Sequence, residues 1–158
     1  DKNRITVPSR IRKTMEELQH EEFFMCRGYD GCLFIFPKQE WDAISRDTRR
    51  YASLDAGAVD LRRMLFGSVQ QVAPDSQGRI PVPEHLRDYA CLDKEAAIVG
   101  ADDHIELWNR SGWREYQRKR ESQFREMVSD FFSAPRSPQG EPDEALAGGG
   151  ASGGTDDA

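Results

Sequence analysis

The chain has 158 residues, of which 37% are hydrophobic and 32% are charged, and its formal net charge is −6 at pH 7. This length allows one compact domain or two very small ones. No apolar run approaches the roughly 20 residues that span a membrane, and no signal peptide is visible. The three cysteines are odd in number and the composition is not that of a small disulfide-linked protein, so we expect reduced thiols and a cytoplasmic protein.

An internal repeat organises the chain. The segment 75–83 repeats the segment 1–8 with an offset of 75, and a second block repeats with an offset of 72. Two blocks in the same order indicate a duplicated unit. The clearest aligned pairs are Arg4 with Arg79, Ile5 with Ile80, Val7 with Val82, Pro8 with Pro83, Arg12 with Arg87, Asp30 with Asp102, Phe36 with Trp108 and Trp41 with Trp113.

The two copies differ in one respect at their beginning. Arg79 follows Asp75 by four residues, whereas Arg4 follows Asp1 by only three. The equivalent of Asp75 would therefore stand immediately before Asp1. We expect about ten further N-terminal residues in the complete protein, which would supply this acid and one strand.

Both copies are predicted to contain the same elements in the same order. In copy one, a strand ends in Ile-x-Val-Pro and a helix follows with apolar positions 11, 15 and 18 on one face. A hairpin over 23–27 and 32–36 turns at Asp30-Gly31, and a helix begins after Pro37 and carries Trp41, Ile44 and Tyr51.

The elements of copy two are predicted to be slightly shorter. Its short helix covers 84–90, and its hairpin pairs 96–99 with 105–108 around Asp102-Asp103. The last helix runs from about 111 to 132 and has an apolar stripe at Phe124, Met127, Val128 and Phe131. Between the copies we predict a helix over 59–65 and a strand over 66–72.

These elements define the expected domains. We predict a first repeat over 1–42, a helical connector over 43–66, a second repeat over 67–113 and a C-terminal helix over 114–133. The tail 134–158 is rich in Gly, Ala, Pro and acidic residues and has a single large apolar residue, Leu146. Such a segment cannot bury enough surface to offset its ordering entropy, so we predict disorder there.

The residues needed for catalysis are scattered. The three histidines lie far apart in the sequence, and Cys26 and Cys32 stand on opposite arms of one hairpin without a second pair to complete a zinc site. The glycine-rich tail lacks the strand and the lysine of a phosphate-binding loop. We predict no enzyme, no metal, no cofactor and no small-molecule substrate.

The repeated Asp-x-x-x-Arg loop is the remaining candidate site. In a purely structural interpretation, Asp75 binds backbone amides of its turn and pairs with Arg79, while Gly78 supplies a left-handed residue. In a functional interpretation, the turn also aims its arginine at a phosphate or a guanine edge. Residues 1–13 carry five basic residues and one acid, which favours an anionic partner. The basic run 118–120 lies in a helix that also carries Glu115, Glu121 and Glu126, and it is interpreted as a solvated, salt-bridged helix face.

The doubled Asp-x-x-Gly-Arg-Ile-x-Val-Pro loop resembles that of the MraZ family, bacterial transcriptional regulators with two AbrB/SpoVT-type half-domains in one chain. The resemblance covers about residues 1–132 and also rests on Phe66-Gly67, Arg87-Asp88-Tyr89-Ala90 and Ile105-Glu106-Leu107-Trp108. It implies an α+β fold: a swapped-hairpin AbrB-like β-barrel built from an internal duplication, flanked by short helices and one long C-terminal helix. It also implies a nucleoid-associated, ring-forming repressor that binds tandem double-stranded DNA repeats upstream of the cell-division and cell-wall gene cluster.

The resemblance implies a set of site residues. We expect copy one to form the DNA face through Arg4 and Arg10, and Asp75–Arg79 mainly to brace the barrel or a subunit interface. The alternatives are an AbrB-like antitoxin or protein-binding module, and a purely structural oligomer. The expected DNA-binding residues are Lys2, Arg4, Arg10, Arg12, Lys13, Arg79 and Arg87, and the expected loop-structuring residues are Asn3, Asp75 and Gly78.

Overall fold

The computed structural model describes residues 3–17, 21–50 and 56–133, except for the side chain of residue 50. The predictions for Lys2, Leu18, Tyr51 and the tail 134–158 lie outside these residues. The described elements are β1 (Arg4–Thr6), α1 (Ser9–Glu17), β2 (Phe23–Arg27), a 3₁₀ turn (Tyr29–Gly31), β3 (Leu33–Pro37), α2 (Lys38–Arg50), α3 (Ala56–Ser68), β4 (Gln70–Val72), β5 (Arg79–Pro81), α4 (Glu84–Tyr89), β6 (Ala96–Gly100), β7 (Ile105–Asn109) and α5 (Arg110–Ser133).

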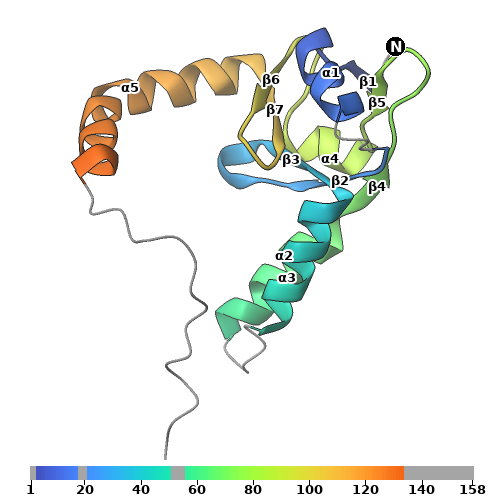
Figure 1. Ribbon diagram of the computed structural model, residues 1–158, viewed down its shortest axis with the longest axis horizontal. Coiled ribbons are helices and arrows are strands. Elements are labelled where there is room, and N and C mark those ends of the chain that lie inside the picture. Colours follow the sequence, from blue (N-terminus) through green and yellow to red (C-terminus); the bar gives the residue numbers. More distant parts are fainter. Residues whose placement is uncertain (1–2, 18–20, 51–55, 134–158) are drawn as a thin grey trace, which may run out of the picture. The chain divides into compact units, whose positions relative to one another are not determined.

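The strands form two antiparallel sheets (Figure 1). β1 pairs with β5, and a larger sheet has the order β4-β2-β3-β7-β6. The predicted mixed α+β architecture is confirmed. The expected closure is not seen among the described strands: β4 and β6 are the two outer strands of the larger sheet and do not pair. The chain leaves this sheet after β4 at Pro74, whose nitrogen cannot donate to a ladder, and then pairs β5 with β1 instead.

The two copies meet in the β1–β5 ladder. Ile5 lies directly opposite Ile80, with Arg4 opposite Pro81 and Thr6 opposite Arg79. Because the sequence repeat aligns residue 5 with residue 80, this antiparallel register places equivalent residues symmetrically on either side of the central pair. The ladder therefore has a local twofold axis between the two copies.

A second ladder repeats this symmetry. In the β3–β7 pair, Phe34 lies opposite Glu106, Leu33 opposite Leu107 and Ile35 opposite Ile105. The offset of 72 aligns residue 34 with residue 106, so the register is again centred on equivalent positions. Both of these ladders thus follow the duplication that the sequence predicts, whereas the β2–β4 ladder has no counterpart in the other copy among the described strands.

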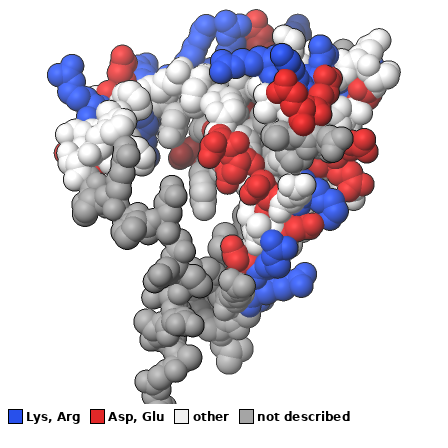
Figure 2. Space-filling view, in the orientation of Figure 1, with Lys and Arg blue, Asp and Glu red and all other residues white. Residues whose placement is uncertain are grey.

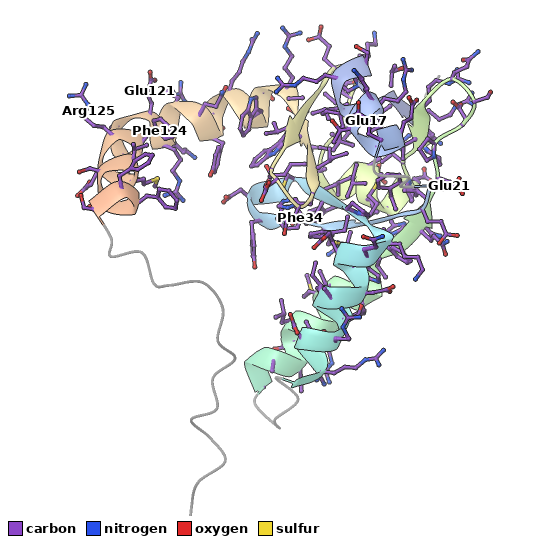
Figure 3. All side chains as sticks on the ribbon, in the orientation of Figure 1. Glu17, Glu21, Phe34, Glu121, Phe124 and Arg125 are labelled. Carbon is purple, nitrogen blue, oxygen red and sulfur yellow. The ribbon has the colours of Figure 1, made fainter. Side chains whose placement is uncertain are left out.

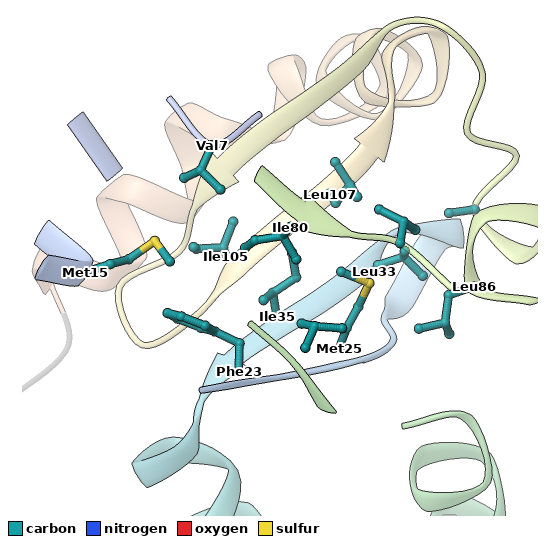
Figure 4. Packing of buried hydrophobic residues seen from close by; sticks show 13 residues of the cluster. Val7, Met15, Phe23, Met25, Leu33, Ile35, Ile80, Leu86, Ile105 and Leu107 are labelled. Carbon is teal, nitrogen blue, oxygen red and sulfur yellow. The ribbon is translucent and has the colours of Figure 1, made fainter. Parts of the chain in front are cut away.

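Residues of both copies pack into one hydrophobic core. Figure 4 shows Met25 and Ile35 of copy one packed with Ile80, Leu86 and Leu107 of copy two, and all five side chains are fully buried. Burial of each such side chain contributes about 1.5–3 kcal/mol. The halves are therefore held together by shared apolar packing as well as by backbone ladders.

A second apolar cluster lies beneath α2 and α3, which run side by side (Figure 1). Trp41 of α2 stacks on Phe24 with ring centroids 5.5 Å apart and meets the edge of Phe66 at 5.3 Å. Ser68 Oγ donates to the Leu65 carbonyl. This packing explains one correction to the prediction: α3 continues through residues 66–68, which were expected to be strand, and only Gln70–Val72 is strand.

The two hairpins differ by one residue. Residues 28–32 separate Arg27 from its partner Leu33, whereas only 101–104 separate Gly100 from Ile105. Gly28 therefore lies in its loop and Gly100 in strand β6, although the repeat aligns them. Both loops still place an aspartate in the left-handed region, with φ of 53° at Asp30 and 65° at Asp102.

The last helix begins at an asparagine. Asn109 Oδ1 accepts hydrogen bonds from the backbone N–H groups of Ser111 and Gly112 at 2.9 and 3.2 Å, which satisfies two free donors of the first turn. The described residues up to Glu121 belong to one compact unit, and residues 122–133 belong to a second. No described helix has the length and apolarity to cross a bilayer.

Candidate nucleic-acid interface

Asp75 organises the turn that precedes β5. Its Oδ1 accepts hydrogen bonds from the backbone N–H groups of Gln77 and Arg79, both at 2.9 Å, and its carbonyl accepts from Gly78 N at 2.8 Å. Its Oδ2 accepts from Arg79 Nε at 2.8 Å. Gly78 has a φ of +70°, which suits glycine. The predicted Asp75–Arg79 pair and the left-handed Gly78 are both present.

The same carboxylate also faces the other copy. Arg4 Nη1 of β1 lies 3.5 Å from Asp75 Oδ2. The side chains of Arg4, Arg79 and Asp75 are 39%, 28% and 29% exposed, so they form a partly covered surface group. One aspartate thus orients two guanidinium groups that occupy equivalent positions in the repeat.

These contacts hold the Asp75 carboxylate in its charged form. The backbone hydrogen bond from Arg79 is the main cause, with further hydrogen bonds from the Arg79 side chain and Gln77, and together they lower the pKa of Asp75 below its ordinary value. The turn therefore keeps its shape at neutral pH, and the group keeps a negative charge between its two arginines.

Two further arginines cross between the copies. Arg12 of α1 lies over Gly78: a Cβ at that glycine would stand 2.6 Å from Arg12 Cδ, and Arg12 Nη1 donates to the Gln77 carbonyl at 3.4 Å. Arg87 of α4 donates to Asn3 Oδ1 at 2.7 Å. Since the repeat aligns Arg12 with Arg87 and Gly78 with Asn3, each helix arginine of one copy contacts the turn of the other.

The remaining basic candidates lie outside this group. Lys13 is 77% exposed and 3.6 Å from Glu17. Arg10 lines a cavity of about 270 Å³ together with Asp102 and His104, on the side of α1 toward the β6–β7 hairpin. Arg4 joins the turns of both copies and Arg10 does not, and the expectation that both contact DNA stays a prediction.

A hollow of about 930 Å³ lies beside the turn, at one edge of the basic surface. Arg12, Lys13 and Asp75 line it, and so do Glu16, Glu21 and Glu22. Its four carboxylates outnumber the two basic groups and disfavour a phosphate inside this hollow. Figure 2 shows basic side chains gathered along the margin of the molecule at which α1 lies.

Sequence reasoning found the four arginines and missed how they cross. The available signal was the repeat itself, since two copies joined by a twofold axis place each helix opposite the other copy's turn. The contacts of Arg4 with Asp75 and of Arg87 with Asn3 join both copies into one group, defined here as the arginine cluster: Arg4, Arg12, Arg79 and Arg87 around Asn3, Asp75 and Gly78. The expectation that copy one forms the DNA face stays a prediction.

The described residues contain no group of three or more histidine, cysteine or acidic side chains that could hold a metal ion. Cys26 and Cys32 are buried free thiols, and burial raises the pKa of each to about 12. Thiols in this state are poor nucleophiles at neutral pH.

The fold and this site define a class: a duplicated α+β protein whose two copies jointly present a cluster of arginines. A family model for MraZ protein, which its description also calls antitoxin-like, matches residues 1–62 and 65–132. The chain belongs to the MraZ family.

Individual relatives agree with this assignment. A protein of Moorella thermoacetica named "Transcriptional regulator MraZ" is 38% identical over 134 residues, which cover 83% of this chain and 91% of the relative. Proteins of the same name from Heliobacterium modesticaldum and Carboxydothermus hydrogenoformans are 35% and 36% identical. Their alignments cover 83% and 80% of this chain, and 89% and 86% of the respective relatives.

Proposed function

We propose that this chain is a DNA-binding transcriptional regulator and not an enzyme. The observation that carries the proposal is the arginine cluster, in which both copies of the repeat contribute guanidinium groups to one surface. The family and the names of the relatives support it. Arginines held at fixed angles suit the recognition of phosphates and guanine edges.

Within this proposal the basic residues have different tasks. Arg4 and Arg79, aimed by Asp75, are the candidates for contacts with base edges. Arg12 and Arg87 brace the opposite turns and contact phosphates, and Lys2, Arg10 and Lys13 add phosphate contacts at the margin. Asn3, Asp75 and Gly78 shape the turns.

We further propose that the two half-domains form the swapped-hairpin fold of AbrB-type proteins, with repeats over 1–42 and 67–113. Several copies would assemble into a ring that binds tandem repeats upstream of the cell-division and cell-wall gene cluster and represses it, in the cytoplasm at the nucleoid. A head-to-tail contact that closes gives a ring. Weak contacts between each subunit and one repeat then add through effective concentration.

The test is the affinity for the promoter of the protein's own operon, measured by fluorescence anisotropy over a series of salt concentrations. The variants Arg4→Gln and Arg79→Gln should each lose about 1–3 kcal/mol of binding free energy if they contact base edges. Arg63→Gln is the matched control, because Arg63 is an exposed arginine of α3 that pairs with Asp60 at 3.1 Å. Wild-type affinity and salt slope in both cluster variants would contradict the proposal.

A protein-binding role is the second candidate, because the family description includes an antitoxin-like assignment. The affinity for a protein partner should fall only modestly in moderate salt, whereas the affinity for DNA falls steeply with salt concentration. A chain that forms oligomers and binds neither DNA nor a partner would favour the purely structural alternative.

A further inference from the structure

The tip of the turn at Asp75 carries an exposed glutamine. Gly78 N donates to the Asp75 carbonyl at 2.8 Å, which closes a β-turn with Ser76 and Gln77 as its two central residues. Both of them are exposed. Figure 3 shows the loop between β4 and β5, which contains this turn, at the edge of the molecule beside Glu21. Gln77 is therefore open to a large partner without any rearrangement of the fold.

The backbone of Gln77 is held on both sides of its Cα atom. Its N–H donates to Asp75 Oδ1 at 2.9 Å, and its carbonyl accepts from Arg12 Nη1 at 3.4 Å. The following Gly78 is buried beneath Arg12 and has a φ of +70°. Only the side-chain torsions of Gln77 remain to be ordered when a ligand binds, which lowers the entropic cost of recognition.

The side-chain amide of Gln77 has no hydrogen-bond partner among the residues that the structure describes. It stands beside the arginine cluster, because its backbone N–H and the Arg79 guanidinium share the Asp75 carboxylate. An amide presents a donor and an acceptor side by side. Such a free pair at the tip of a basic turn fits a ligand edge that offers the complementary acceptor and donor.

Among the groups that duplex DNA exposes, the adenine edge in the major groove satisfies both halves of the amide. Adenine offers the N6 donor next to the N7 acceptor, whereas guanine offers two acceptors, and cytosine and thymine each offer a single polar group. A phosphate also offers only acceptors, so the amide carbonyl would face anionic oxygens. Arginines suit guanine and phosphate for the same reason. The chemistry of Gln77 therefore differs from that of its charged neighbours.

We propose that Gln77 recognises an adenine base in the major groove, its amide oxygen accepting from N6 and its amide nitrogen donating to N7. This contact sets a sequence preference of the copy-two turn. The inference rests on the proposed DNA binding and adds a neutral residue to a site otherwise described by its arginines. The repeat aligns Gln77 with Lys2, whose side chain has donors only. The aligned position of copy one cannot form the same pair, so the two turns of one chain differ in what they recognise.

The first experiment measures the affinity for the promoter of the protein's own operon by fluorescence anisotropy, with each base pair of the bound segment replaced in turn at one salt concentration. In the wild-type chain, replacing the A·T pair that Gln77 contacts by G·C should weaken binding by about 5- to 150-fold, which corresponds to one bidentate contact. Gln77→Ala should lose the preference at this one position and keep the others. Gln39→Ala, at an exposed glutamine of α2, is the matched control and should keep them all.

The second experiment tests the contacting atoms. At the position so found, 7-deazaadenine removes the N7 acceptor and leaves the Watson–Crick pair intact. This replacement should weaken binding of the wild-type chain by about fivefold, as expected for one hydrogen bond. It should leave the affinity of Gln77→Ala unchanged, because only the wild-type amide donates to N7. Gln77→Arg should shift the preference at this position from A·T toward G·C, since arginine pairs with guanine O6 and N7.

The variants at Gln77 should leave the fold in place. The turn holds Gln77 by its backbone, so Gln77→Ala should keep the thermal transition and, because the side chain is neutral, the salt slope of DNA binding. An unchanged base preference in Gln77→Ala, or a loss of affinity equal on all sequences, would overturn the inference. If Arg79→Gln still weakens binding in that case, the proposed function stands without it. Equal affinity of the wild-type chain for the promoter and for an unrelated duplex would contradict both.

Discussion

Ile5 of β1 lies directly opposite Ile80 of β5, and these two residues hold the same place in the two copies of the repeat. The pair is symmetric in backbone register and asymmetric in burial, because Ile80 is fully buried whereas Ile5 is only partly covered. The fused copies therefore share an axis without having identical surroundings.

This asymmetry predicts unequal costs of truncation. Ile80→Ala should lower the free energy of unfolding by about 2–5 kcal/mol, because it leaves a cavity in the shared core. Ile5→Ala should cost clearly less, since part of its side chain already meets solvent. Urea denaturation monitored by tryptophan fluorescence measures both. Equal losses would show that the two sites are equally packed.

Replacing Gly78 with alanine should destabilise the turn by more than about 1 kcal/mol. The residue has a φ of +70°, and the new Cβ would stand 2.6 Å from Arg12 Cδ, so both the backbone and the arginine must shift. The matched control is Gly67→Ala in α3, where a Cβ meets nothing within 4 Å and helix propensity should add about 0.5–1 kcal/mol. In thermal denaturation, Gly78→Ala should lower the melting temperature and Gly67→Ala should raise it. An unchanged melting temperature for Gly78→Ala would contradict this account of the turn.

Asp75 should make stability depend on pH at the acidic end. Its pKa is lowered in the folded state, so the carboxylate stabilises the fold above its unfolded pKa, which is about 3.9, and this contribution is lost as the pH falls through the lower, folded value. Asp75→Asn should therefore be less stable than wild type at pH 7, and the difference should shrink below about pH 4.

The control for this measurement is Asp60→Asn, which removes a pair on the exposed side of α3. It should produce a much smaller difference across the same pH range, because exposed ion pairs contribute about 0–1 kcal/mol. A pH-independent gap between wild type and Asp75→Asn would show that the carboxylate acts through its shape and not its charge.

Thiol reactivity should separate Cys91 from the other two cysteines. Cys91 is exposed, whereas burial raises the pKa of Cys26 and Cys32 to about 12. A chromogenic disulfide reagent at pH 8 should modify one thiol quickly in the native protein and all three after denaturation. Cys91→Ser should abolish the fast phase. Rapid reaction of two or three native thiols would mean that the hairpin opens readily.

Much of this organisation could be predicted from the sequence because duplication leaves a direct signal. The offset of 75 aligned Ile5 with Ile80, which lie opposite each other, the offset of 72 aligned the two hairpins, and periodicity identified α5. Local turn chemistry was equally informative, since an aspartate four residues before an arginine can bind both its backbone and its side chain.

The errors arose where tertiary packing decides. Residues 66–68 have the composition of a strand start, yet the contact of Phe66 with Trp41 and the Ser68 hydrogen bond to Leu65 keep them helical. The sequence also did not indicate the contacts that cross between the copies, from Arg4 to Asp75, from Arg12 to Gln77 and from Arg87 to Asn3. The preference for copy one as the DNA face, which came from charge along the sequence, stays a prediction.

The crossed turns have a consequence for the DNA sites that such a subunit could read. A homodimer must present identical residues in both halves, and so it favours a palindrome. Here one polypeptide carries asparagine in one turn and glycine in the other, with threonine and proline at the matching strand positions 6 and 81. The two halves of the surface therefore differ, and under the proposed DNA binding one subunit would favour an asymmetric site over a palindrome.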